Sequence, residues 1–155
     1  MMMNGHSNEE GHVKSTAKAS WSGSMKEGAG KISVASGLFK DAPYSSKGRF
    51  EGGVKETTPE ELIAAAHASC FTMAFGFALT RAEMPARSIE TGCEVEVVMG
   101  PAGANITKSA LTCKVEVPGA DAAKVREIAE GSKNGCPVST ALQGNVQMEL
   151  DAKLE

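Results

Sequence analysis

The sequence has no excess of basic residues and no block of like charge. Sixteen Lys and Arg residues against nineteen Asp and Glu residues give a net charge of −3 over 155 residues. A surface that binds nucleic acid normally carries a basic excess, so we expect no nucleic acid partner. The length and the 41% content of hydrophobic residues suit a single soluble domain.

The N-terminal part also lacks the apolar run of an export signal. We expect residues 1–16 to be a flexible extension, with no role for His6 or His12, followed by one domain over residues 17–155. The expected compartment is the cytoplasm, where reducing conditions disfavour structural disulfides. None of the four cysteines stands in a C-x-x-C motif, which excludes the common zinc and thioredoxin-like spacings.

Residues 62–79 contain no charged side chain and are long enough to raise the question of a membrane span. This segment is rich in small residues and contains His67, so its total hydrophobicity is modest. A helix that is apolar on most sides is better interpreted as a central helix of the core. We therefore expect no membrane association.

Local patterns predict an α+β protein. The expected elements are a β-hairpin over 17–25 and 31–36, a loop over 37–47, an extended piece over 48–52, a helix over 58–79, antiparallel strands over 89–99 and 106–117, a helix from 121 to 135, a short helix from 136 to about 144, and a strand over 146–150. Thr58, Pro59 and Glu61 form a helix-start signature, and Pro85 requires the long helix to end before it.

The long apolar helix poses a problem of burial. One small sheet covers about one face of a helix, so the opposite face needs either a second sheet from the same chain or an identical helix from another subunit. An identical helix from a second copy is the economical solution, which predicts a two-fold homodimer.

The four cysteines differ in their surroundings. Cys93 and Cys113 lie on the apolar faces of their strands, and a core role explains both. Cys136 lies between Gly135 and Pro137 at a helix start, where backbone N–H groups favour a thiolate. It remains open from position alone whether Cys136 is functional.

Cys70 lies in the middle of the long helix, far from the helix ends that lower a thiol pKa. A reactive thiol there needs a nearby cation. Arg49, between glycines, is the candidate, and Glu60 is able to orient its guanidinium. Glu60 and Cys70 are about 15 Å apart along one helix, so we expect each site to combine Cys70 of one subunit with Arg49 and Glu60 of the other.

Several motifs together resemble the OsmC/Ohr family of osmotically inducible and organic-hydroperoxide-resistance proteins. They are TTPEELIAAAHASCF at 57–71, GCPVSTAL at 135–142, ASWSG at 19–23, Pro43-Tyr44 and RFEGG at 49–53. The residues of these motifs are closer to the OsmC branch, and the resemblance extends from about residue 17 to the end.

The resemblance implies an intertwined α+β homodimer with long central helices, acting as a thiol peroxidase without a cofactor. It implies that Cys70 is the peroxidatic cysteine and Cys136 the resolving one, that Arg49 stabilises the thiolate, and that Glu60 holds Arg49. The substrates would be organic hydroperoxides and hydrogen peroxide, and the reductant an external dithiol of the dihydrolipoyl type. Cys93 and Cys113 match no motif of the family.

Two alternatives remain open. His67, Cys70 and Cys136 resemble an incomplete metal site, although a fourth ligand is missing and His67 is better interpreted as a hydrogen-bonded core or interface residue. The other alternative is a non-enzymatic dimer that binds a small apolar ligand, with both thiols incidental.

Overall fold

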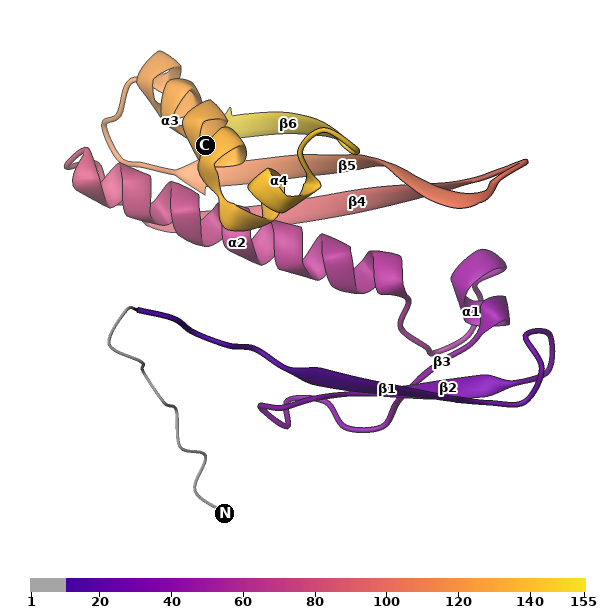
Figure 1. The fold of residues 1–155 in the computed structure, drawn as a ribbon. Helices are drawn as coiled ribbons and strands as arrows, with labels where there is room; N and C mark the ends of the chain where they lie inside the picture. Colours follow the sequence, from indigo (N-terminus) through magenta and orange to yellow (C-terminus); the bar gives the residue numbers. More distant parts are fainter. Residues whose placement is uncertain (1–10) are drawn as a thin grey trace. The chain divides into compact units, whose positions relative to one another are not determined.

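The computed structural model describes residues 11–155. The chain forms two compact units, one ending at Thr58 and the other spanning Pro59–Glu155, and each unit has its own three-stranded sheet (Figure 1). Of the extension expected over residues 1–16, residues 1–10 lie outside the described part and residues 11–16 are exposed without regular structure. The mixed composition of helices and sheets confirms the α+β class.

The N-terminal unit begins with the predicted β-hairpin. Strands β1 (Ala17–Ser22) and β2 (Ala29–Val34) pair antiparallel. Tyr44 packs over this sheet, since its hydroxyl donates to the carbonyl of Ser20 at 3.0 Å. A side chain at Gly30 would collide with the Tyr44 ring, which explains the glycine in the middle of a strand.

The segment after the hairpin is more regular than the sequence predicts. It contains strand β3 (Ala42–Tyr44), which pairs with β2, and the short helix α1 (Ser46–Phe50). The predictions of a loop over 37–47 and of an extended piece over 48–52 are therefore wrong at these positions. Ser45 caps α1 by accepting the Gly48 N–H at 3.0 Å, and its hydroxyl also bonds the carboxylate of Glu56.

The C-terminal unit is built on a mixed sheet covered by helices. Its elements are α2 (Pro59–Arg81), β4 (Ser88–Gly100), β5 (Gly103–Glu116), α3 (Ala122–Gly135), α4 (Pro137–Leu142) and β6 (Gln147–Leu154). The strand order is β4-β5-β6, with β4 and β5 antiparallel as predicted and β6 parallel to β5. Helix α2 packs along β4, α3 along β6, and the two helices contact each other (Figure 1).

The core of this unit lies between the helices and one face of the sheet. Alternate residues of β5 point into it, among them Leu111, Cys113 and Val115. From α2, Phe71 and Phe75 pack into the same core, and the centroids of these two rings are 5.6 Å apart. The alternation predicted for β4 and β5 is confirmed, because exposure alternates along both strands.

Helix α2 buries one face only. Its buried residues are Glu60, His67, Phe71, Phe75 and Leu79, whereas Met73 and Phe77 are 77% and 66% exposed. Within the C-terminal unit, the expectation of a helix buried on several faces is therefore not met. By length and hydropathy alone, α2 is also apolar enough to cross a membrane, with a mean hydropathy of 1.7 over its most apolar window.

Candidate functional site

Cys70 lies at the border between the packed and the open face of α2. It is a half-buried free thiol that packs against the apolar core. The residue that follows it, Phe71, is fully buried, and Met73 is largely exposed. This placement supports the sulfur from the core side and leaves part of it accessible.

Cys136 occupies the junction between α3 and α4 and is fully buried. Asp121 caps the start of α3, as predicted, and the helix ends at Gly135. Cys136 then serves as the N-cap of α4, followed by Pro137 in the first helical turn. Its sulfur accepts the N–H of Ser139 at 3.4 Å and lies 3.1 Å from the hydroxyl of Ser139.

The fold brings the thiols of Cys70 and Cys136 into contact, although they are far apart in the sequence. The pKa of Cys70 is raised, first by burial and then by the hydrogen bond and the charge of Cys136. The backbone N–H of Val138 acts in the opposite direction, because it donates a hydrogen bond to the Cys70 sulfur and so lowers the pKa.

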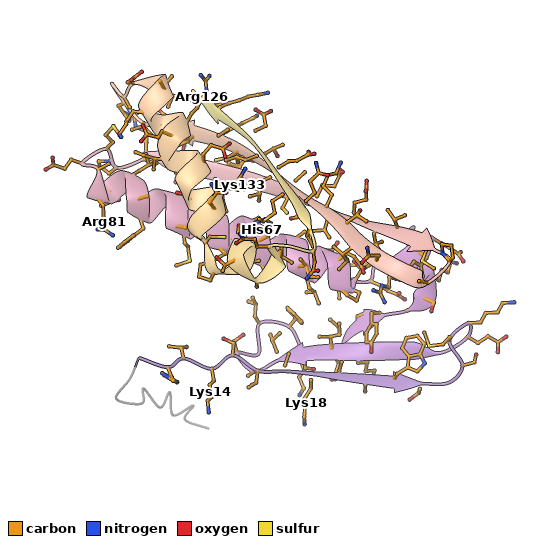
Figure 2. All side chains as sticks on the ribbon, turned by 45° about the horizontal axis from the view of Figure 1, so that its top comes forward. Lys14, Lys18, His67, Arg81, Arg126 and Lys133 are labelled. Atoms are coloured by element: carbon orange, nitrogen blue, oxygen red, sulfur yellow. The ribbon has the colours of Figure 1, made fainter. Side chains whose placement is uncertain are left out.

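His67 lies one turn before Cys70 on α2 and is fully buried (Figure 2). Its Nδ1 is 2.6 Å from the hydroxyl of Ser109, and its Nε2 is 2.8 Å from that of Ser139. Burial lowers the pKa of His67, so the ring is neutral. The prediction of a hydrogen-bonded core histidine is confirmed.

The metal alternative finds no such support in the described part of the chain. Among residues 11–155, no group of three or more His, Cys, Asp or Glu side chains is arranged to hold a metal ion. Both ring nitrogens of His67 already contact serine hydroxyls.

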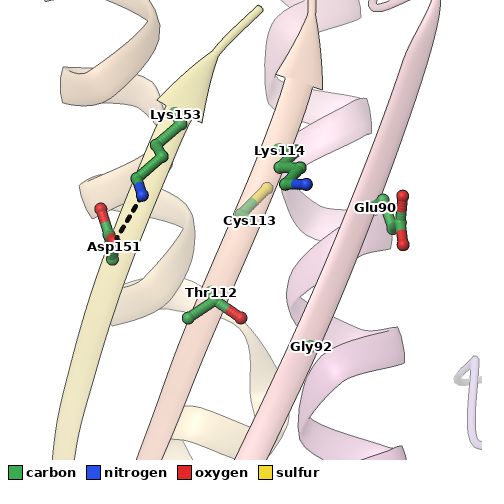
Figure 3. A pocket seen from close by; sticks show the side chains of 7 residues that line it. All are labelled: Glu90, Gly92, Thr112, Cys113, Lys114, Asp151 and Lys153. Atoms are coloured by element: carbon green, nitrogen blue, oxygen red, sulfur yellow. Dashed lines mark ion pairs between the residues drawn. The ribbon is translucent and has the colours of Figure 1, made fainter.

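Cys113 and Cys93 occupy different environments. Cys113 is buried, and burial raises the pKa of its thiol. It also borders a shallow pocket over β4, β5 and β6, beside Gly92 and the ion pair of Asp151 and Lys153 (Figure 3). Cys93 is half-buried and contacts the hydroxyl of Ser109 at 3.3 Å. Cys113 therefore fits the expected core role, and Cys93 belongs to the polar group around His67.

Arg49 and Glu60 lie on the two different units. Arg49 is on α1, with its guanidinium carbon 5.2 Å from the centre of the Phe50 ring. Glu60 is the second residue of α2 and is 6% exposed, which is unusual for a carboxylate without a specific role. Their action on Cys70 stays a prediction.

The sequence analysis did not single out Ser109, Ser139 and Val138, which contact His67, Cys136 and Cys70. Ser139 carries a local signal, since it is the third residue after an N-cap cysteine and its N–H is therefore directed at the capping sulfur. Ser109 carries none, because it appears as one more alternating residue of a strand.

A mixed α+β fold with two contacting thiols, one half-exposed and one buried, defines the class of two-cysteine thiol proteins. Residues 52–151 match the family described as OsmC-like protein, and the chain belongs to this family. It is 41% identical to peroxiredoxin OsmC of Escherichia coli (strain K12) over 141 residues, covering 91% of this chain and 98% of the relative.

More distant relatives agree with this assignment. The chain is 30% identical to the organic hydroperoxide resistance protein of Xanthomonas axonopodis pv. citri, over 76% of this chain and 82% of the relative. Among solved structures, OhrB of Bacillus subtilis matches with a TM-score of 0.68 and 26% identity, covering 89% of this chain and 98% of that one. An organic hydroperoxide resistance protein OsmC of Legionella pneumophila matches with a TM-score of 0.72 and 24% identity, covering 89% and 96%, and supports the fold. The resemblance to the OsmC/Ohr family is confirmed.

Proposed function

We propose that this protein is a thiol-dependent peroxidase that reduces organic hydroperoxides, and hydrogen peroxide as well, with Cys70 as the peroxidatic and Cys136 as the resolving cysteine. The observation that carries the proposal is the contact between these two thiols, one accessible and one buried. The names of the relatives, peroxiredoxin and organic hydroperoxide resistance protein, support it.

The reaction follows from thiol chemistry. The Cys70 thiolate attacks the distal oxygen of the hydroperoxide, the O–O bond breaks, and the departing alkoxide takes a proton to become an alcohol. Cys70 is then a sulfenic acid. Cys136 attacks its sulfur, the S–O bond breaks, water leaves, and the disulfide forms. An external dithiol restores both thiols by exchange, and its oxidation balances the reduction of the peroxide.

The raised pKa of Cys70 shows that the two thiols alone do not stabilise the Cys70 thiolate. The first step requires a thiolate, but burial and the Cys136 contact both favour the neutral thiol. A cation beside the sulfur reverses this preference. Arg49 supplies it in our proposal, and Glu60 orients the guanidinium through a bidentate pair.

The exposed face of α2 supports a homodimer. An apolar helix with Met73 and Phe77 largely exposed is an unfavourable surface in water, and a second copy of the same helix covers it. This also accounts for the hydropathy of α2 without a membrane, and we assign the protein to the cytoplasm. We also propose that the two units form one domain over residues 17–155; the match to the E. coli relative, which extends over 91% of this chain and so includes parts of both units, supports this.

The oligomeric state is testable by sedimentation at micromolar concentration. We expect a dimer for the wild type and a weakened dimer for Phe77→Glu. Met99→Glu places the same charge on an exposed apolar residue of β4 and serves as the control. A wild-type monomer would reject the homodimer.

The peroxidase assignment is tested by thiol titration. One equivalent of cumene hydroperoxide should remove two free thiols from the wild type and none from Cys70→Ser. Peroxide consumption that is unchanged in Cys70→Ser would disprove the assignment and leave a ligand-binding dimer as the alternative. The same assay with dihydrolipoamide, thioredoxin and glutathione in turn tests the dihydrolipoyl class of reductant.

Shared sites are tested at pH 7 by mixing subunits that are each impaired in a different residue. If Arg49 acts on Cys70 of the partner subunit, a heterodimer of Arg49→Ala and Cys70→Ser contains one complete site and regains part of the activity. The matched control combines Cys70→Ser with Cys136→Ser. Because these two cysteines act within one chain, that pair should stay inactive. Equal recovery of activity in both mixtures would contradict the shared site, and so would a lack of recovery in both.

A further inference from the structure

A continuous chain of polar side chains crosses the core of the C-terminal unit. It runs from Cys136 to Ser139 at 3.1 Å, to His67 at 2.8 Å, to Ser109 at 2.6 Å, and to Cys93 at 3.3 Å. The first four residues are fully buried, and Cys93 is half-buried. Four elements contribute to it: α4, α2, β5 and β4.

Burying so many polar side chains in a row costs free energy, which indicates that they serve a function. The core around it consists of residues such as Phe71, Leu111 and Val115, and any buried hydroxyl or imidazole must find a hydrogen-bond partner there. Every described buried side-chain nitrogen and oxygen does so. Apolar residues of similar volume would pack the same space without this requirement.

The donor-to-acceptor direction of these hydrogen bonds follows from the group that donates at the Cys93 end. A neutral imidazole carries one N–H and one acceptor nitrogen, and burial keeps His67 neutral. Burial likewise raises the pKa of Cys93, against a smaller lowering by the Ser109 hydrogen bond, so the protonated Cys93 has an S–H to donate. If Cys93 donates to Ser109, the Ser109 hydroxyl donates to Nδ1, the ring proton resides on Nε2, and Nε2–H donates to Ser139. The Ser139 hydroxyl then has its proton directed at the sulfur of Cys136.

We propose that His67 is a positioning residue for the resolving thiol: the chain from Cys93 through Ser109 and His67 orients the Ser139 hydroxyl as a donor to Cys136 and stabilises the Cys136 thiolate. The proposal rests on the proposed function, because it assigns a step of that reaction. The Ser139 N–H, 3.4 Å from the same sulfur, is a second donor. Hydrogen bonds to the charged form of an acid favour that form.

The thiolate is the reacting form of Cys136 in both halves of the cycle. In the resolving step its electron pair forms the S–S bond to Cys70, the S–O bond of the sulfenic acid breaks, and the proton lost by the Cys136 thiol completes the water that leaves. In the reducing step the Cys136 sulfur departs as a thiolate when the dithiol attacks Cys70, and the oriented hydroxyl stabilises it.

Other ionisable groups lie on the elements that pack around these side chains. Helix α2 contributes Cys70, which contacts Cys136 directly. From α3, Lys133 is paired with Glu130 at 3.0 Å. From β5, Cys113 lies in the core with a raised pKa and stays protonated.

The test measures the ionisation of Cys136 in the full-length protein without any peroxide. Thiolate absorbance is titrated in the Cys70→Ser protein, and the same titration of Cys70→Ser/Cys136→Ser is subtracted. In the Cys70→Ser protein, Ser139→Ala should shift the ionisation of Cys136 upward by about one pH unit. Ser109→Ala, whose residue does not contact Cys136, should shift it in the same direction by a smaller amount. Ser109→Thr retains the hydroxyl and should restore the original curve.

The corresponding kinetic test uses the protein with all four cysteines. At neutral pH, Ser139→Ala should slow disulfide formation after a single equivalent of cumene hydroperoxide about tenfold, while the oxidation of Cys70 keeps its rate. Cys93→Ala should slow the same step, and Cys93→Ser, which retains a donor, should not. If Ser109→Ala does not fold, the Cys93 pair provides the remote perturbation.

The outcomes separate this inference from the function on which it rests. A Cys136 ionisation that is unchanged in both Ser109→Ala and Cys93→Ala would overturn the inference, even if the enzyme is a peroxidase. Failure of peroxide to oxidise Cys70 would overturn the proposed function. The peroxide-free titration would still show whether the hydrogen-bonded side chains affect the ionisation of Cys136.

Discussion

Replacing Arg49 by alanine should change the pH dependence of the first step more than its maximal rate. Without a cation, the pKa of Cys70 lies above its ordinary value of 9.0, so less than about 1% of the thiol is ionised at pH 7. With a cation that ionises the thiol fully, the thiolate fraction is about a hundredfold larger. Full ionisation at pH 7 requires a pKa about three units lower, however, and over this range thiolate nucleophilicity falls about twentyfold. The net loss for Arg49→Ala at pH 7 is therefore about fivefold.

The same arithmetic predicts a crossing of the two pH profiles. The rate of the variant should rise about tenfold per pH unit, whereas that of the wild type stays flat, and the two should meet between about pH 7.5 and pH 8.5. The assay is single-turnover oxidation of Cys70 by cumene hydroperoxide, followed by stopped flow in a Cys136→Ser background. Arg87→Ala is the control, because Arg87 forms an exposed ion pair with Glu116 at 2.5 Å. A flat profile for Arg49→Ala, or an equal effect of Arg87→Ala, would refute the role of Arg49.

Three further predictions concern the C-terminal unit. Cys136→Ser should lose one thiol per equivalent of cumene hydroperoxide instead of two and should proceed to sulfinic acid with excess peroxide, as measured by mass spectrometry. Because burial lowers the pKa of His67, the unfolded state binds the extra proton, and the free energy of unfolding should fall as the pH drops below 6.5 by up to about 1.4 kcal/mol per pH unit. This component of the slope should be absent from denaturant titrations of His67→Gln. Phe71→Ala removes a fully buried ring and should lower the free energy of unfolding by about 3–5 kcal/mol, as measured by urea unfolding.

The elements that the sequence predicted well are those with local signals. Helix α2 has Pro59 at its first position and ends before Pro85, and both residues act through their own backbone geometry. Strands β4 and β5 show the alternation of a sheet with one buried face. Helix α1 was missed because Ser45 and Glu56, which hold its start, are 11 positions apart and meet only in the folded chain.

The same distinction applies to the candidate site. Cys70 and Cys136 stand out by their motifs, and the helix start at Cys136 is a local feature. The partners of His67 are 42 and 72 positions away, at Ser109 and Ser139. No periodicity connects such residues, since the packing of α2, β5 and α4 alone brings them together.

The positions along α2 explain why the two thiols differ in exposure. Residues 67, 71, 75 and 79 are buried at intervals of one turn, and residues 73 and 77 are exposed on the opposite side. Cys70 falls on the flank between these two rows and is half-buried. Cys136 is fully buried and contacts Cys70. In our proposal, peroxide therefore oxidises Cys70, and Cys136 reacts only with the oxidised sulfur of Cys70, with the help of internal hydrogen-bond donors. The serine beside it and the histidine behind that serine are the donors that the structure provides.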